Sequence, residues 1–254
     1  MPDPETAAPD VPSQNTAGAY LEAAQALLAE AATSQAEAIA RAAEACTRAV
    51  ERDGLIYIFG TGHSHLMAEE GHFRAGGLAC VVPILATSIM LHEGALVSTR
   101  MERMSGLAEI VMSRYPLGPD DALFVFSTSG VNSVPVEAAR YGRERGTPVI
   151  GVTSLAYSTA AAKGRQRLAD VADIVLDTGA PAGDAIAPLG GGLFAGPVST
   201  IIGAAFLNAV LVQCAANLIA SGREAPVYRS ANMPGAVEHN LRLAERYAAR
   251  NPHL

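Results

Sequence analysis

Two short stretches of the sequence place hydroxyl side chains and glycine directly after an apolar run. The first loop, GTGHS at residues 60–64, follows residues 55–59, and the second loop, STSGVNS at residues 127–133, follows residues 122–126. A strand that ends in such a turn and opens a helix leaves backbone N–H groups unpaired, and a tetrahedral oxyanion can bind to them. One turn alone is equally well explained as the serine cap of an ordinary helix, but two of the same design favour a ligand. The predicted anion-binding residues are Gly60, Thr61, Gly62, His63, Ser64, Ser127, Thr128, Ser129, Gly130, Asn132 and Ser133.

The elements that must position these loops are short apolar runs that alternate with helical patterns. The runs cover residues 55–59, 79–85, 122–126, 148–153 and 174–176. Continuous apolar strands indicate a parallel sheet that is covered on both faces, and right-handed crossovers make it doubly wound. The sequence therefore predicts an α/β fold with a flavodoxin-like, five-stranded parallel sheet. Ligands bind such sheets beyond the carboxyl ends of the strands, which is where both loops lie.

The rest of the chain divides by composition. Residues 1–14, rich in proline and aspartate, are expected to form a disordered tail, and residues 15–52 an amphipathic N-terminal helical arm. Residues 53–225 form the predicted ligand-binding domain, and residues 226–254 a C-terminal extension. Within the domain, residues 179–197 are loop-like and contain three consecutive glycines, which favours a lid over the carboxyl edge of the sheet. Residues 198–220 form a helix that is apolar almost all round, as in a core or a dimer interface.

Composition excludes several classes of function. The formal net charge of −7 argues against a nucleic-acid-binding surface. The three cysteines are far apart and lack metal-ligand spacing, as expected of free buried thiols in a reducing compartment. The N-terminus is acidic and shows no signal peptide, and the most apolar run, residues 201–212, is too short for a hydrocarbon layer of about 30 Å. We expect a cytoplasmic protein with no membrane partner.

The ordered pair of loops, each between a strand and a helix, resembles the SIS (sugar isomerase) domain over roughly residues 45–220. The tail SANMPG at residues 230–235, with EHN at 238–240, is similar to a stand-alone, phosphosugar-binding branch of that family. The resemblance implies a phosphorylated or otherwise anionic sugar ligand. It also implies a homodimer or larger even homo-oligomer, because SIS domains commonly dimerise. Regulators of the family usually carry a basic helix-turn-helix, whereas the first fifty residues here are rich in alanine and glutamate.

Aldose–ketose isomerisation needs a base that moves a proton between adjacent carbons and a group that shuttles protons on the oxygens. The connection after the second strand carries His92 and Glu93, and family isomerases often have acid/base residues there. The resemblance therefore implies Glu93 as the base and His92 as the shuttle, the alternative being a solvated loop. The residue types and their position match those of the family, but the sequence of the motif is not identical.

Other candidates lie on the helix after the first loop and near the C-terminus. Zinc-dependent heptose-phosphate isomerases of the family carry a His-Phe-x-x-Glu pair, whereas here His72 is followed four residues later by Gly76. Many members have a catalytic glutamate where this chain has Arg74, which leaves Glu70 as the runner-up carboxylate. His239 is the candidate that could complete a site across a dimer.

No metal is favoured, and no cofactor is predicted, although zinc stays possible. A metal would need His63, His65, His72 or His92 to converge with Glu69, Glu70 or Glu93, which the spacing neither requires nor excludes. The sequence thus predicts that the chain binds an anionic sugar, phosphorylated or sulfonated, and isomerises it through an enediol(ate). The alternative is a non-catalytic sugar-phosphate-binding or sensor module. Ether or deamination chemistry has no supporting residues beyond the pocket.

Overall fold

The computed structural model describes residues 16–254, so the predicted tail at residues 1–14 lies outside the described residues. Five parallel strands form the central sheet in the order β2-β1-β3-β4-β5, which confirms the predicted flavodoxin-like topology. Their bounds are Val81–Ile84 for β2, Ile56–Gly60 for β1, Ala122–Phe126 for β3, Val149–Thr153 for β4 and Ile174–Asp177 for β5. Strands β1, β3 and β4 are buried throughout because helices cover both faces of the sheet.

The register of the sheet brings the two loops together. Gly60 at the end of β1 pairs with Phe126 at the end of β3, so the first and second loops leave the sheet side by side. The first loop continues into the short helices η1 (Gly62–His65) and α3 (Leu66–Gly71), and the second loop opens α6 (Ser133–Glu144). Both loops therefore lie at the carboxyl edge of the sheet.

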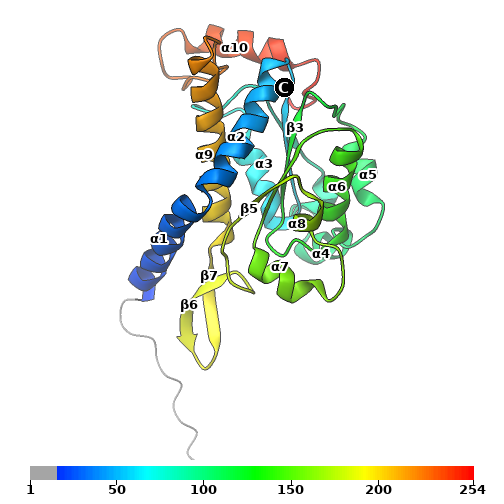
Figure 1. The fold of residues 1–254 in the computed structure, drawn as a ribbon, viewed down its shortest axis with the longest axis vertical. Helices are drawn as coiled ribbons and strands as arrows, with labels where there is room; N and C mark the ends of the chain where they lie inside the picture. Colours follow the sequence, from blue (N-terminus) through cyan, green and yellow to red (C-terminus); the bar gives the residue numbers. More distant parts are fainter. Residues whose placement is uncertain (1–15) are drawn as a thin grey trace, which may run out of the picture.

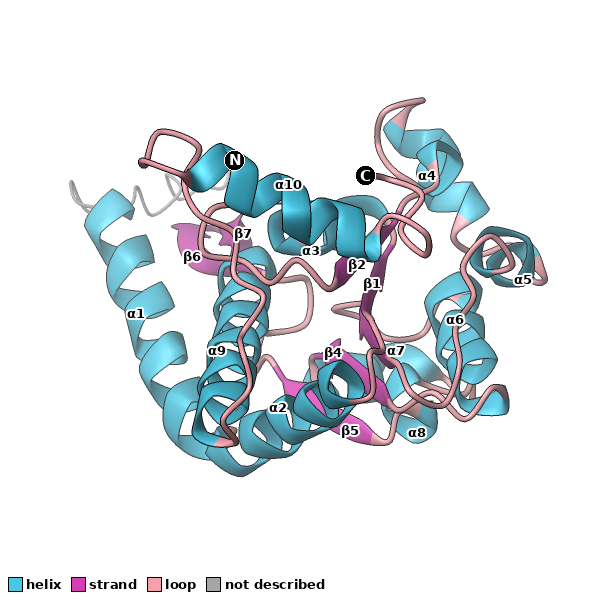
Figure 2. Cartoon of the chain, turned by 90° about the horizontal axis from the view of Figure 1, so that it is seen from above, coloured by secondary structure: helices cyan, strands magenta, loops and turns pink. Residues whose placement is uncertain are grey.

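The remaining helices form the covering layers. Figure 1 shows α2 (Ala36–Glu51) and α9 (Ser199–Ala220) on one side of the sheet, with α5 (Leu107–Met112) and α6 on the other. The α1 helix (Thr16–Ser34) extends away from the sheet beside α9, as Figure 2 shows from above. The smaller helices η2 (Thr87–Ile89), α4 (Ala95–Met101), α7 (Leu155–Ala162) and α8 (Leu168–Val171) lie in the connections after the strands.

The prediction that residues 179–197 form a loop was wrong for most of the segment. Strands β6 (Ala185–Gly190) and β7 (Leu193–Pro197) pair as an antiparallel hairpin. The glycines at 190–192, which suggested a loop, make its turn with positive φ angles, a backbone conformation that glycine adopts without steric cost. The hairpin is anchored to α1, where the hydroxyl of Tyr20 donates to the carbonyl oxygen of Pro197 at 2.9 Å.

By length and composition alone, α9 could cross a membrane, with 22 residues and a mean hydropathy of 1.8 in its most apolar window. Its buried residues, which include Phe206, Leu207 and Cys214, belong to the hydrophobic core. Asn208, which interrupts the apolar run, donates to the carboxylate of Glu70 at 3.1 Å. The packing is that of a core helix whose outer side stays partly exposed, at Val212 and Ile219 among others.

The C-terminal segment covers the opposite, amino edge of the sheet, at the top of Figure 1. Helix α10 (Ala236–Tyr247) is followed by Arg250, whose guanidinium lies 2.7 Å from the carboxylate of Asp121, just before β3. Asp121 is buried and also accepts the backbone N–H groups of Leu55 and Gly118, both at 2.8 Å. These hydrogen bonds fix the starts of β1 and β3.

Candidate functional site

A cavity of about 550 Å³ opens at the carboxyl edge, between the two loops, α7 and the start of α9. Its polar lining residues are Thr61, His63, Ser64, Glu102, Arg103, Ser127, Thr128, Ser129, Asn132, Tyr157, Arg165, Thr178, Asp184, Ser199 and Thr200. Seven of the eleven predicted anion-binding residues are therefore in its wall. The other four, Gly60, Gly62, Gly130 and Ser133, are next to lining residues in the chain but do not line the cavity themselves.

The second loop is held rigidly by its backbone. The carbonyl oxygen of Thr128 accepts from Ser154 N at 3.1 Å and from the hydroxyl of Thr153 at 3.2 Å. The carbonyl oxygen of Gly130 accepts from Leu168 N at 2.7 Å, and its N–H donates to the Ser127 hydroxyl at 3.2 Å. The donors belong to β4, to the N-cap of α7 and to α8. Because these three elements hold the loop by hydrogen bonds, its shape does not depend on a ligand.

Several donors of the second loop remain available to a ligand. Within residues 16–254, the backbone N–H groups of Thr128, Ser129, Val131, Asn132 and Ser133 have no protein acceptor. In the same part of the chain, the Thr128 and Ser129 hydroxyls make no hydrogen bond to protein and both line the cavity. Helix α6, twelve residues long, begins at Ser133, so its partial positive charge faces the same side. This geometry is that of an oxyanion site.

The first loop is held by one side-chain and one backbone hydrogen bond. The Thr61 hydroxyl donates to Glu102 Oε2 at 2.7 Å, and Ser64 N donates to the Thr61 carbonyl oxygen at 3.0 Å. Gly60 is required by close packing, because a Cβ there would lie 2.3 Å from the carbonyl oxygen of Ser64. The loop continues into a 3-10 turn and a six-residue helix, which gives it a much weaker helix terminus than the second loop.

Glu102 is a cavity-lining carboxylate that was not among the residues predicted from the sequence. It follows α4 directly and is half-buried in the cavity wall, and its backbone carbonyl accepts from Val134 N, in the first turn of α6, at 3.0 Å. Glu102 thus connects the two loops through one backbone and one side-chain hydrogen bond. It lies in the predicted connection after the second strand, but no local motif separates it from the charged residues around it.

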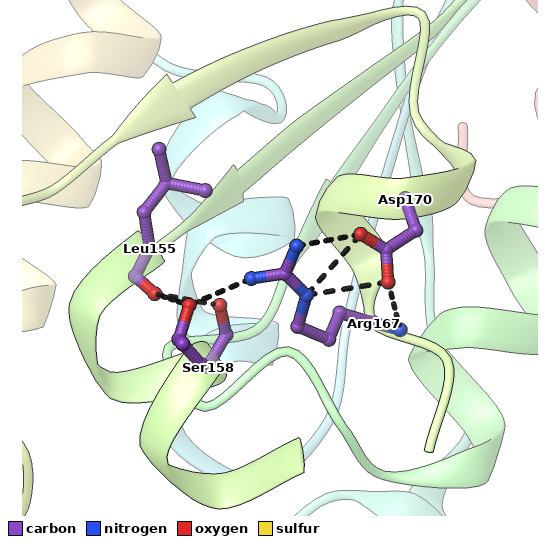
Figure 3. Close-up of polar contacts among 5 residues, drawn as sticks. Leu155, Ser158, Arg167 and Asp170 are labelled. Carbon is purple, nitrogen blue, oxygen red and sulfur yellow. Dashed lines mark hydrogen bonds and ion pairs between the residues drawn. The ribbon is translucent and has the colours of Figure 1, made fainter. Parts of the chain in front are cut away.

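The wall opposite the first loop comes from α7 and the segment after it. Tyr157, Ala161 and Arg165 line the cavity there. Figure 3 shows the Arg167 guanidinium bound to the Asp170 carboxylate beside α7. Arg167 also donates to the Thr159 hydroxyl of α7 at 2.7 Å. The hydrogen bond from Arg167 lowers the pKa of Asp170 below its ordinary value. Helices α7 and α8 are thereby joined behind the second loop.

Asp184, which directly precedes the hairpin, lines the cavity on that side. One carboxylate oxygen accepts from Ser199 N at 2.8 Å and the other from the Ser199 hydroxyl at 2.5 Å, so this carboxylate caps α9. Its negative charge is thus engaged with the helix terminus. This leaves Glu102 as the lining carboxylate with the freer oxygen, since the only hydrogen bond to its side chain among residues 16–254 is the one to Oε2.

None of the four predicted catalytic residues, Glu93, His92, Glu70 and His239, lines the cavity. His92 and Glu93 are exposed on the connection before α4. Glu70 pairs with Arg74 and accepts from Asn208 of α9, so its carboxylate is engaged outside the cavity. His239 lies at the amino edge, with Nε2 2.9 Å from the Val227 carbonyl oxygen. Its role across a dimer stays a prediction.

The zinc pair of the heptose-phosphate isomerases has no counterpart at His72. Its ring packs near His253, with ring centroids 6.4 Å apart, and burial lowers the pKa of His72. The partner position is Gly76, which offers no ligand atom. The residues present here therefore do not fit the family's metal site.

Comparison with known proteins agrees with this architecture. The family model for the SIS domain matches residues 19–154. A UPF0309 protein of Brucella anthropi is 54% identical over 203 residues, covering 80% of this chain and 84% of the relative. Among solved structures, a phosphoheptose isomerase of Francisella tularensis has a TM-score of 0.52 at 18% identity, covering 83% of this chain and all of that one. One from Neisseria gonorrhoeae has a TM-score of 0.50 at 20% identity, with 82% and 98% covered. The chain belongs to the SIS domain family.

Proposed function

We propose that this protein binds a phosphorylated or otherwise anionic sugar in the 550 Å³ cavity and interconverts its aldose and ketose forms. The observation that carries the proposal is the meeting of two donor-rich loops and one half-buried carboxylate, Glu102, in that cavity. The solved relatives named phosphoheptose isomerases support the same class of reaction through a shared fold.

The anion is assigned to the second loop. Its backbone N–H groups and the hydroxyls of Thr128 and Ser129 point to one tetrahedral group at the start of α6. Arg165 lines the same cavity, and its guanidinium, which also donates to the carbonyl oxygens of Ala161 and Ala162, adds a positive charge that attracts a phosphate or sulfonate. The neutral part of the sugar then extends toward the first loop, which lies beside the second at the sheet edge.

The proton transfer is assigned to Glu102. As the base, it would take the proton from one sugar carbon and return it to the neighbouring carbon through an enediol(ate). The Thr61 hydroxyl holds Oε2 in place at 2.7 Å, which leaves Oε1 to accept the proton. His63 and Ser64, which line the cavity beside Thr61, are placed to move protons on the sugar oxygens. This proposal transfers the role expected of Glu93 to a carboxylate in the cavity wall.

The test has two stages. A thermal-shift screen of hexose, pentose, heptose and amino-sugar phosphates and of sulfosugars identifies the ligand, because binding to the folded state raises the melting temperature. Exchange of the substrate C–H proton with deuterium from solvent then reports the chemistry. Glu102→Gln should keep the thermal shift and lower the exchange rate by about 10²–10⁴-fold, whereas Glu93→Gln should exchange like the wild type.

The outcomes separate the alternatives. Loss of exchange in Glu93→Gln with retention in Glu102→Gln would return the role of base to Glu93. A thermal shift without exchange in the wild-type protein, for the best-binding sugar, would favour the sensor module instead.

A further inference from the structure

We propose that His65, Glu69 and His92 form a binding site for a divalent transition-metal ion of the zinc class. One ligand atom from each of the three side chains lies within 4.8 Å of the other two. None of the three lines the sugar cavity, and none belongs to the His72 position at which zinc-dependent relatives bind their metal. The site stands independently of the proposed isomerase activity.

His65 has a buried ring nitrogen, Nε2, that is free to bind a metal ion. Its side chain is buried, with 4% of its surface exposed. The Nδ1 atom contacts the carbonyl oxygen of Gly62, and because a carbonyl only accepts, Nδ1 carries the proton. The neutral ring then has its lone pair on Nε2, which is buried without a hydrogen-bond partner. An imidazole oriented by a carbonyl on one nitrogen, with the other nitrogen free, is the usual arrangement of a metal-binding histidine.

The spacing of the three groups fits tetrahedral coordination. His65 Nε2 lies 3.3 Å from Glu69 Oε1, without the geometry of a hydrogen bond, and His92 Nε2 lies 3.9 Å from the same oxygen. Zinc–ligand distances of about 2.0–2.1 Å separate two ligands of a tetrahedron by about 3.3–3.4 Å. The first pair already has that separation, and the exposed His92 needs only a small side-chain movement to reach it.

The donor set selects the kind of metal. Two imidazole nitrogens and one carboxylate suit zinc, cobalt or nickel, whereas magnesium and calcium prefer an all-oxygen shell. Glu69 and His92 are about half exposed, so the fourth position faces solvent and water can fill it. Three protein ligands with one open position are typical of zinc sites that exchange a ligand.

The three ligands come from separate parts of the carboxyl edge. His65 ends the 3-10 turn of the first loop, Glu69 lies one turn later on α3, and His92 comes from the connection before α4. The rings of His65 and His92 already meet edge to face, with centroids 5.4 Å apart. A bound cation would therefore link the first loop to the segment before α4, the helix that Glu102 follows. This link would lie next to the sugar cavity.

The test uses the full chain without a histidine tag, stripped with chelator and dialysed. Titration calorimetry with Zn²⁺ should show one ion per chain, and Co²⁺ should give the visible absorption of a tetrahedral complex. Because His65 is buried, the variants are made at the two exposed ligands. Glu69→Gln and His92→Gln should each weaken Zn²⁺ binding by at least about 100-fold, since removing a ligand costs more than removing a group behind it.

Two matched variants control for adventitious binding. Glu93→Gln removes the neighbouring exposed carboxylate, and His63→Gln removes an exposed imidazole of the first loop that is not in the cluster. Both should bind Zn²⁺ like the wild type. Absence of stoichiometric binding, equal binding in Glu69→Gln, or loss of binding in His63→Gln would each overturn the assignment.

Discussion

The first and second loops follow the same strand–turn–helix plan, yet they are stabilised in different ways. The second loop is tied by main-chain bonds, from Ser154 N to the Thr128 carbonyl and from Leu168 N to the Gly130 carbonyl. The first loop depends on side chains, with Thr61 bound to Glu102 and the His65 ring bound to the Gly62 carbonyl. Among residues 16–254, the first loop is therefore the one whose supporting hydrogen bonds involve a carboxylate and an imidazole side chain.

This difference assigns separate tasks to the loops. A loop whose own carbonyls are satisfied by neighbouring backbone can present fixed N–H donors to an anion at no reorganisation cost. A loop held by a carboxylate and an imidazole can instead respond to protons, metals and the bound sugar. We therefore interpret the second loop as the anion-binding scaffold and the first loop as the reactive side of the cavity.

The largest expected effect contrasts the glycines of the two loops. Gly130 has a φ of +60°, and a Cβ there would lie 2.6 Å from the Thr153 hydroxyl. Gly130→Ala should lower the free energy of unfolding by about 2–4 kcal/mol, the sum of left-handed strain and overpacking. Gly62 has a φ of +55° with nothing within 4 Å of the added Cβ, so Gly62→Ala should cost only about 1–2 kcal/mol of strain. Urea unfolding of both variants measures the difference, and equal losses would remove the structural contrast between the loops.

A second contrast concerns binding of the anion. Ser129→Ala should weaken binding of the anionic sugar found in the thermal-shift screen by about 1–3 kcal/mol, because a charge-assisted hydrogen bond is lost. Ser64→Ala should also weaken it, by an amount at the lower end of that range, since the first loop offers a weaker helix terminus. Titration calorimetry gives both values, and the neutral sugar should bind the variants and the wild type alike. A larger effect at Ser64 would place the anion on the first loop.

A third contrast pairs two threonines. Thr61→Val removes the donor that holds Glu102 Oε2 but keeps the shape of the side chain. We expect an exchange rate about tenfold lower at saturating sugar, equivalent to about 1.4 kcal/mol in the barrier, with little change in affinity. Thr128→Val should show the reverse, a weaker affinity with the exchange rate preserved. Parallel losses in both variants would mean that binding and chemistry are not divided between the loops.

The five parallel strands and both loops could be predicted from the sequence because each depends on local pattern. Buried parallel strands read as apolar runs, and each glycine-containing loop directly follows one. The hairpin at 185–197 was missed because its strands lack clear alternation and include Pro188, while the glycines at its turn resemble a flexible loop. Its anchor, Tyr20, lies 177 residues away in the sequence.

Glu102 and Arg165 could not be placed in the site for a related reason. Glu102 stands among Arg100, Arg103 and Met104 in a stretch that reads as a solvated helix end. Its position in the cavity depends on hydrogen bonds to Thr61 and Val134, which come from two other segments. His92 and Glu93 were the more conspicuous pair in the same connection, but both side chains are exposed outside the cavity.

The smallest expected effect tests how far the support of the second loop extends. Asp170 pairs with Arg167 on α8, the helix whose first N–H group binds the Gly130 carbonyl. Because the hydrogen bond from Arg167 lowers the pKa of Asp170, the pair stabilises the fold above the ordinary Asp pKa of about 3.9, and this contribution is lost as the pH falls below it. The carboxylate is 38% exposed, so solvent screening limits the loss of unfolding free energy in Asp170→Asn to about 0.5 kcal/mol at neutral pH.

Urea unfolding at neutral pH and near pH 3 measures this loss, and the difference in unfolding free energy from wild type should shrink on acidification. The control Glu44→Gln, which breaks an exposed pair on α2, should change little at either pH. A loss that persists in acid would mean that the shape of Asp170 rather than its charge holds α8 against the second loop.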